Sequence, residues 1–77
     1  MATNSAVVVE VVVDGNQLRI ARLSDTRWQV GYRGVEATGR RLVGLLEEAL
    51  GRRHPDVPRL AVQAMEANPR RVVDAQP

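Results

Sequence analysis

The sequence predicts an α+β fold: an antiparallel meander of three to four strands packed on one amphipathic helix, followed by a second short helix. Two patterns carry this prediction. The first half of the chain holds a valine-rich run and then alternating apolar and polar residues between turn signals, which is typical of strands. The second half repeats apolar residues at the spacing of a helix face.

The expected elements follow one another along the chain. Strands are expected at residues 7–13, 17–23, 27–32 and 35–38, and helices at residues 42–50 and 57–67. A chain of 77 residues has room for one small domain. We therefore expect a single α+β domain over residues 7–67, with an N-terminal tail at 1–6 and a C-terminal tail at 68–77.

The first hairpin is predicted from its turn and its register. Asp14-Gly15-Asn16 is a tight-turn signal, because glycine and asparagine tolerate positive φ. A two-residue turn places Val11 opposite Leu18, whereas a three-residue loop would place Val11 opposite Arg19. The shorter turn is favoured because it joins two apolar faces. It also sets Glu10 opposite Arg19, a cross-strand pair of opposite charge.

The third and fourth strands extend the same apolar face. Ser24-Asp25-Thr26 is predicted to be a three-residue loop, which sets Ile20 opposite Val30. The fourth strand follows a reversal that contains glycine, and we expect it to turn Val35 and Ala37 inward.

Two helices are predicted from apolar stripes with i, i+3, i+4 spacing. The first stripe consists of Leu42, Leu45, Leu46, Ala49 and Leu50, and the second of Val57, Leu60, Ala61, Ala64 and Met65. Thr38 or Gly39 is expected to cap the first helix, and Gly51 to end it in a left-handed conformation. Gly44 lowers helix stability by about 1 kcal/mol relative to alanine. Two explanations for a glycine at this position are open: a neighbour packs closely against it, or it is a tolerated defect. Asn68-Pro69 is expected to end the second helix.

Composition limits the chemistry and the partners of the chain. There are no cysteines, so disulfides and thiolate metal sites are excluded. The eleven basic residues are all arginine and the net charge is +2, which is weak support for a nucleic-acid partner. The arginine, alanine and valine bias suits the coding sequence of a high-GC bacterium or phage. The longest apolar stretch, residues 6–13, is too short to span a membrane, and the N-terminus lacks a basic signal-peptide region, so we expect a cytoplasmic protein.

No group of residues indicates an enzyme, a metal site or a cofactor site. Glu47 and Glu48 are neighbours on a helix and point about 100° apart, so they cannot converge on one substrate. His54 lies in a linker with no second ligand nearby and is interpreted as a surface histidine. The GxxxxG pattern of residues 34–39 is followed by two arginines instead of the lysine and hydroxyl residue of a phosphate-binding loop. We therefore expect no catalytic residue, no metal, no cofactor and no small-molecule substrate.

The outer face of the predicted sheet is the candidate interaction surface. Val8 and Val12 are expected there, and such apolar side chains suggest cover by the tail, a second copy or a protein partner. Arginine and glutamine on the same face suit base reading in a DNA groove. The candidate nucleic-acid or anion contacts are Arg19, Arg27, Gln29, Arg33, Arg40 and Arg41, of which the last two lie at the start of the first helix.

The segment Gly34-Val-Glu-Ala-Thr-Gly39-Arg-Arg-Leu42-Val-Gly-Leu45-Leu-Glu-Glu-Ala-Leu50 resembles the strand-to-helix segment of HicB-type antitoxin domains. It covers 17 of the 77 residues. Arg40-Arg41 stands where the family usually has a cap such as Asp-Thr, and the first hairpin is arranged differently. The resemblance implies a small antitoxin that binds a toxin and dimerises, usually with DNA contact through an appended motif that is not visible in this sequence. It assigns no functional residue to this chain.

These observations predict a small non-enzymatic binding or regulatory protein that acts through protein–protein contacts, as an oligomer or within a larger assembly. The alternative is a nucleic-acid-binding module that uses the arginine- and glutamine-rich sheet face. No contact with a membrane is expected.

Overall fold

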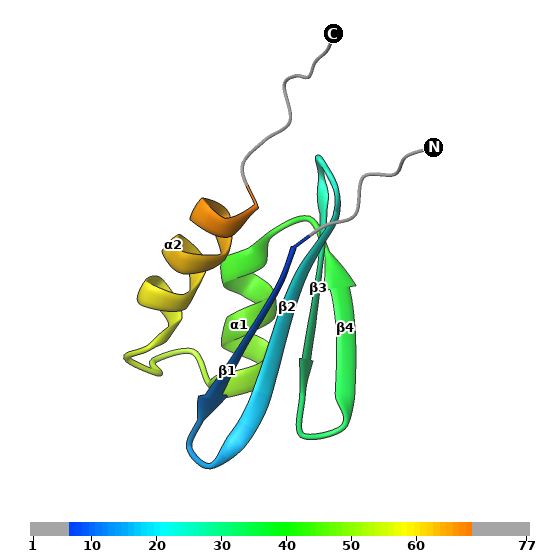
Figure 1. Cartoon of the computed structure of the whole chain (residues 1–77). Helices are drawn as coiled ribbons and strands as arrows, with labels where there is room; N and C mark the ends of the chain where they lie inside the picture. Colours follow the sequence, from blue (N-terminus) through cyan, green and yellow to red (C-terminus); the bar gives the residue numbers. More distant parts are fainter. Residues whose placement is uncertain (1–6, 69–77) are drawn as a thin grey trace, which may run out of the picture.

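The computed structural model describes residues 7–68, and these form an α+β fold as predicted (Figure 1). The elements are β1 (Val8–Val13), β2 (Asn16–Ser24), β3 (Arg27–Tyr32), β4 (Val35–Gly39), α1 (Leu42–Leu50) and α2 (Val57–Ala67). All four strands are antiparallel and form one sheet in the order β1-β2-β3-β4. Both helices lie on the same side of this sheet, so its other side forms an outer face (Figure 1). The predicted tails lie outside the described residues, apart from Asn68.

The β1–β2 hairpin has the predicted register. Val11 lies opposite Leu18, and Glu10 lies opposite Arg19. The turn contains two residues, Asp14 with φ of 52° and Gly15 with φ of 82°. Positive φ at both central positions is the geometry of a type I′ turn, whose twist matches that of the flanking strands. An Asp-Gly pair is favoured in such a turn because both residues tolerate positive φ.

The β2–β3 connection has the predicted register but not the predicted loop. Ile20 lies opposite Val30, as expected. However, the register shifts between Arg22 and Ser24, so that Leu23 is an extra residue in β2 and Ser24 already pairs with β3. A β-bulge followed by a two-residue turn therefore replaces the three-residue loop. The three-residue loop and the bulge with its two-residue turn contain the same number of residues. The pairing of the rest of β2 with β3 is therefore the same in both, and the register could not distinguish them.

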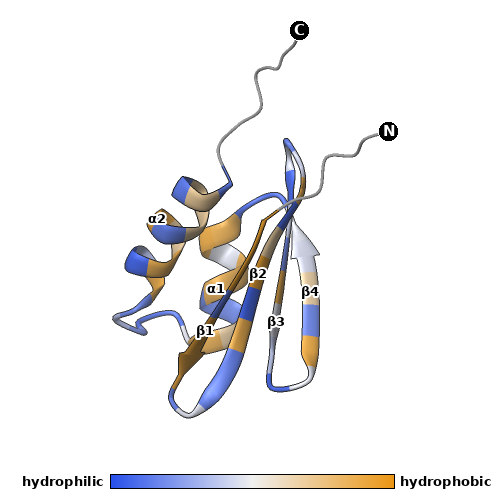
Figure 2. Cartoon of the chain, in the orientation of Figure 1, coloured by the Kyte–Doolittle hydropathy of each residue, from blue (hydrophilic) through white to orange (hydrophobic). Residues whose placement is uncertain are grey.

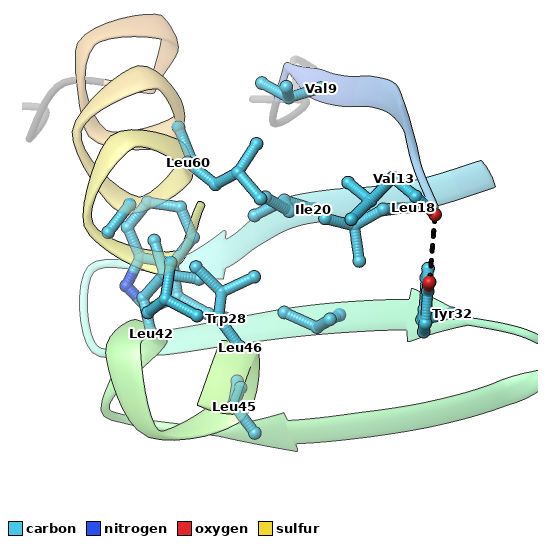
Figure 3. Close-up of a cluster of buried hydrophobic side chains, with 14 residues drawn as sticks. Val9, Val13, Leu18, Ile20, Trp28, Tyr32, Leu42, Leu45, Leu46 and Leu60 are labelled. Atoms are coloured by element: carbon cyan, nitrogen blue, oxygen red, sulfur yellow. Dashed lines mark hydrogen bonds between the residues drawn. The ribbon is translucent and has the colours of Figure 1, made fainter. Parts of the chain in front are cut away.

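The core fills the space between the sheet and the two helices (Figure 3). Its largest fully buried side chains come from four elements: Leu18 and Ile20 from β2, Val30 from β3, Leu46 from α1 and Leu60 from α2. Trp28 and Tyr32 are the two aromatic residues, and both are buried. The Tyr32 hydroxyl donates a 2.9 Å hydrogen bond to the Val13 carbonyl, which ties β3 to the end of β1 on the inner face.

Several details of the helices and of β4 differ from expectation. Val35 has the inward register of Ala37 but remains 68% exposed, because a hollow that Leu45 and Ala49 of α1 also line lies beside it. Met65 is 48% exposed, so the buried stripe of α2 ends at Ala64. Thr38 and Gly39 belong to β4, and the N-cap of α1 is Arg41, which makes no side-chain cap.

The ends of both helices were predicted at the correct residues. Gly51 ends α1, and its N–H donates to the Glu47 carbonyl. Its φ of 118° and ψ of 142° give the expected positive φ, although the pair lies outside the left-handed helical region. Asn68 ends α2 and is buried. Within residues 7–68, no helix has the length and apolar character needed to cross a membrane.

Candidate interaction surface

The outer face of the sheet carries the side chains that alternate with the core residues. Its members include Val8, Glu10, Val12, Gln17, Arg19, Ala21, Gln29, Gly31, Glu36 and Thr38, together with Leu23 at the bulge. A shallow hollow lies on this face where the small residues Ala21 and Gly31 stand, with Val8 and Leu23 on its rim. The surface is therefore mixed: apolar at Val8 and Val12 toward the two ends of β1, and polar across the middle.

The polar groups in the middle of this face are bonded to one another. Arg19 Nε lies 2.9 Å from Glu10 Oε2, as the cross-strand register predicts. Gln17 Nε2 donates a 3.2 Å hydrogen bond to the same carboxylate. Gln29 Nε2 donates a 3.2 Å hydrogen bond to Glu36 Oε1 on β4. At the centre of the face, two carboxylates thus outnumber the single arginine.

The candidate arginines do not gather into one basic patch. Arg27 begins β3 and pairs with Ser24 at the bulge end of the sheet. Arg33 follows the other end of β3, in the turn to β4. Arg33 lies six positions beyond Arg27, a span of about 20 Å along the strand. Arg33 has φ of 54°, a conformation that costs a residue with a Cβ atom free energy and that asparagine or glycine adopts more readily.

Arg40 and Arg41 lie away from the strands, at the start of α1, and both are exposed. The first turn of α1 contains no acidic residue. An anion at this helix start therefore stays a prediction that rests on sequence alone.

Val8 and Val12 project from β1 as predicted. Val12 is 72% exposed and Val8 is 42% exposed. Leu23, at the bulge of β2, is 50% exposed and lines the same hollow as Val8. Colouring by hydropathy shows β1 as hydrophobic along most of its length (Figure 2). The apolar part of the face thus lies along the edge strand.

His54 is not the surface residue that the sequence suggested. Its side chain is only 14% exposed, and its Nε2 lies 3.0 Å from Asp14 Oδ2 in the first turn. The Asp56 N–H donates to its Nδ1 at 3.1 Å, which makes Nε2 the nitrogen that donates to Asp14. The imidazole therefore fastens the linker between the helices to the β1–β2 turn. Among residues 7–68 no three histidine, aspartate or glutamate side chains are grouped so as to hold a metal ion.

Comparison with known proteins gives no family for this chain: no family model, no curated protein and no solved structure matches it.

Proposed function

We propose that the chain is a small, non-enzymatic, cytoplasmic binding protein that acts through protein contacts made by β1 and the adjoining outer face. The observation that carries the proposal is the exposure of Val12 and Val8 on an edge strand, with the exposed Leu23 beside Val8. Burying a valine or leucine side chain stabilises a complex by about 1.5–3 kcal/mol. Cover over these three side chains would therefore contribute several kcal/mol to association.

The alternative, a nucleic-acid-binding module, has weaker support. Side chains that read a base edge do so through their donors, and part of the donor capacity of Arg19 and Gln29 is taken by Glu10 and Glu36. These carboxylates would also lie against the phosphate backbone. Arg27 and Arg33 stand at opposite ends of β3, so phosphate contacts would be few.

The test compares two valines of similar exposure on opposite edges of the sheet. Val12 on β1 is 72% exposed and Val35 on β4 is 68% exposed. Tagged wild-type protein, Val12→Asp and Val35→Asp are expressed in the native host, and co-purifying proteins, including untagged copies of this chain, are quantified by mass spectrometry. We expect Val12→Asp to lose the partner that wild type and Val35→Asp retain, because a charge would be buried without a counter-ion. Equal recovery with Val12→Asp would contradict the proposal.

A further inference from the structure

β1 presents unpaired backbone groups along its outer edge. The two-residue turn closes on the Val13–Asn16 pair, so hydrogen-bonded pairs with β2 recur at every second residue, at Val11 and Val9. The N–H and C=O groups of Val8, Glu10 and Val12 therefore point away from β2. β1 is the first strand in the sheet order, and none of residues 7–68 pairs with this edge.

The edge lacks the usual protection against pairing with another strand. Native edge strands are blunted by charges, proline, bulges or short length. β1 has six residues, of which five are valine, and its bulge-free ladder with β2 is continuous. Its one charge, Glu10, is already neutralised within the chain by Arg19 at 2.9 Å. β4, the other edge, is shorter and contains a glutamate, a threonine and a glycine.

Symmetry limits how a second β1 can join this edge. When two copies of β1 pair antiparallel about a two-fold axis and continue one sheet, residues on the outer face of one copy lie opposite residues on the outer face of the other. The axis must then pass beside a single residue of β1, which lies opposite the same residue of the other copy. An axis at Glu10 would set the two carboxylates directly opposite each other, which is destabilising. An axis at Val11 pairs residues 9–13 and sets Glu10 opposite Val12 of the other copy. The two Glu10 Cα atoms are then about 8 Å apart.

We infer that the partner of β1 is a second copy of this chain, whose β1 pairs antiparallel with it about an axis at Val11. The inference rests on the proposed contact function of β1 and names the partner, but it uses the backbone edge of the strand: in the paired sheet Val8 and Leu23 stay on the exposed outer face, and Val12 lies opposite Glu10 of the other copy. The pairing satisfies the free backbone groups of Glu10 and Val12 in both copies. It also extends the inner apolar face, because Val9 of one copy meets Val13 of the other.

The mass of the full chain in solution tests the pairing. We expect wild type at twice the chain mass of 8.5 kDa. Val12→Pro removes an N–H that points to the free edge and leaves the ladder with β2 intact, so it should run at 8.5 kDa with its circular dichroism unchanged. Val12→Thr keeps that N–H and the branched shape, and should remain dimeric.

Single cysteines test the register, because the chain has no cysteine of its own. Across the proposed axis the two copies of residue 11 form a non-hydrogen-bonded pair with Cα atoms about 4.5 Å apart, within reach of a disulfide. The two copies of residue 12 would be about 8 Å apart, beyond that reach. We expect Val11→Cys to cross-link under mild oxidation several-fold faster than Val12→Cys, although residue 12 is the more exposed.

The outcomes separate this inference from the proposed function. A monomeric wild type would overturn self-pairing, whether β1 is free, is covered by residues outside 7–68 or binds another protein. In that case, loss of a different protein by Val12→Asp would still support a protein-contact function. A dimer that survives Val12→Pro, or that cross-links faster through Val12→Cys, would overturn the β1 pairing.

Discussion

Arg22 Nη1 donates a 2.7 Å hydrogen bond to the backbone carbonyl of Asn68, 46 residues further along the chain. The same guanidinium donates to the carbonyls of Ser24 and Asp25 at the bulge, at 3.2 and 3.0 Å. It also lies over the Trp28 ring at 4.8 Å from the centroid. Arg22 therefore joins the end of α2 to the bulge and to the core, and these bonds hold the helix layer against one end of the sheet.

The Asn68 side chain completes this junction. Its Oδ1 accepts a 2.8 Å hydrogen bond from the Val7 N–H, and its Nδ2 donates to the Ala64 carbonyl. Asn68→Ala would remove two hydrogen bonds and leave the Val7 N–H without its side-chain partner at a partly buried site. We expect the free energy of unfolding to fall by about 1–3 kcal/mol, measured by urea denaturation. Gln63→Ala, an exposed change on the same helix, should alter it by less than about 0.5 kcal/mol.

This junction could be predicted only in part. Asn68-Pro69 predicts the end of a helix, and alternation along β2 places Arg22 on the inner face at its last inward position. The hydrogen bond between Arg22 and Asn68 could not be predicted, because it depends on where α2 lies relative to the bulge. A cap is a local property of the chain, whereas a bond that spans 46 residues is not.

Leu46 is fully buried at the centre of the core, and its truncation tests the packing. We expect Leu46→Ala to lower the free energy of unfolding by about 2–5 kcal/mol, because it opens a cavity in a small core. Val43→Ala on the same helix removes a side chain that is 38% exposed and should cost clearly less. Comparable losses for the two variants, measured by chemical denaturation, would contradict this account of the core.

Gly44 in α1 is a tolerated defect and not a site of close packing. A Cβ atom at this position would meet only the Arg41 Cβ, at 3.8 Å, which is an ordinary contact. Gly44→Ala should therefore raise the free energy of unfolding by about 0.5–1 kcal/mol, since alanine loses less backbone entropy in a helix. Gly39→Ala is the control: its Cβ would meet Leu45 Cδ2 at 3.4 Å, so no gain is expected. A destabilised Gly44→Ala protein would show that the helix has a neighbour at this face.

Strand alternation predicts most of the residues on the candidate surface. It predicts less well how the charges on that surface are paired. Alternation and turn length place Val8, Val12 and Arg19 on the outer face, and the structure has them there. Glu36 is not among the residues predicted for this face, although its outward parity follows from an inward Ala37. Its bond with Gln29 depends on the β3–β4 register, which the short fourth strand leaves weakly determined.

The response of binding to salt distinguishes a protein partner from nucleic acid. A duplex bound through Arg27 and Arg33 would release counterions, and log K would fall against log salt with a slope of about −0.9 per phosphate contact. Arg27→Ala combined with Arg33→Asn should then reduce the slope by about two units. Asparagine is chosen because it accepts the φ of 54° at position 33 without strain.

We expect the opposite result. The association should change only mildly with salt and should survive the double arginine variant, because the apolar surface of β1 carries it and the central charges are paired within the chain. Fluorescence anisotropy with a labelled duplex, across a salt series, measures the competing interaction. Micromolar or tighter duplex binding at physiological salt that the double variant abolishes would overturn the protein-contact proposal. Tight duplex binding that survives the double variant would also oppose it, and would direct attention to Arg40 and Arg41 at the start of α1.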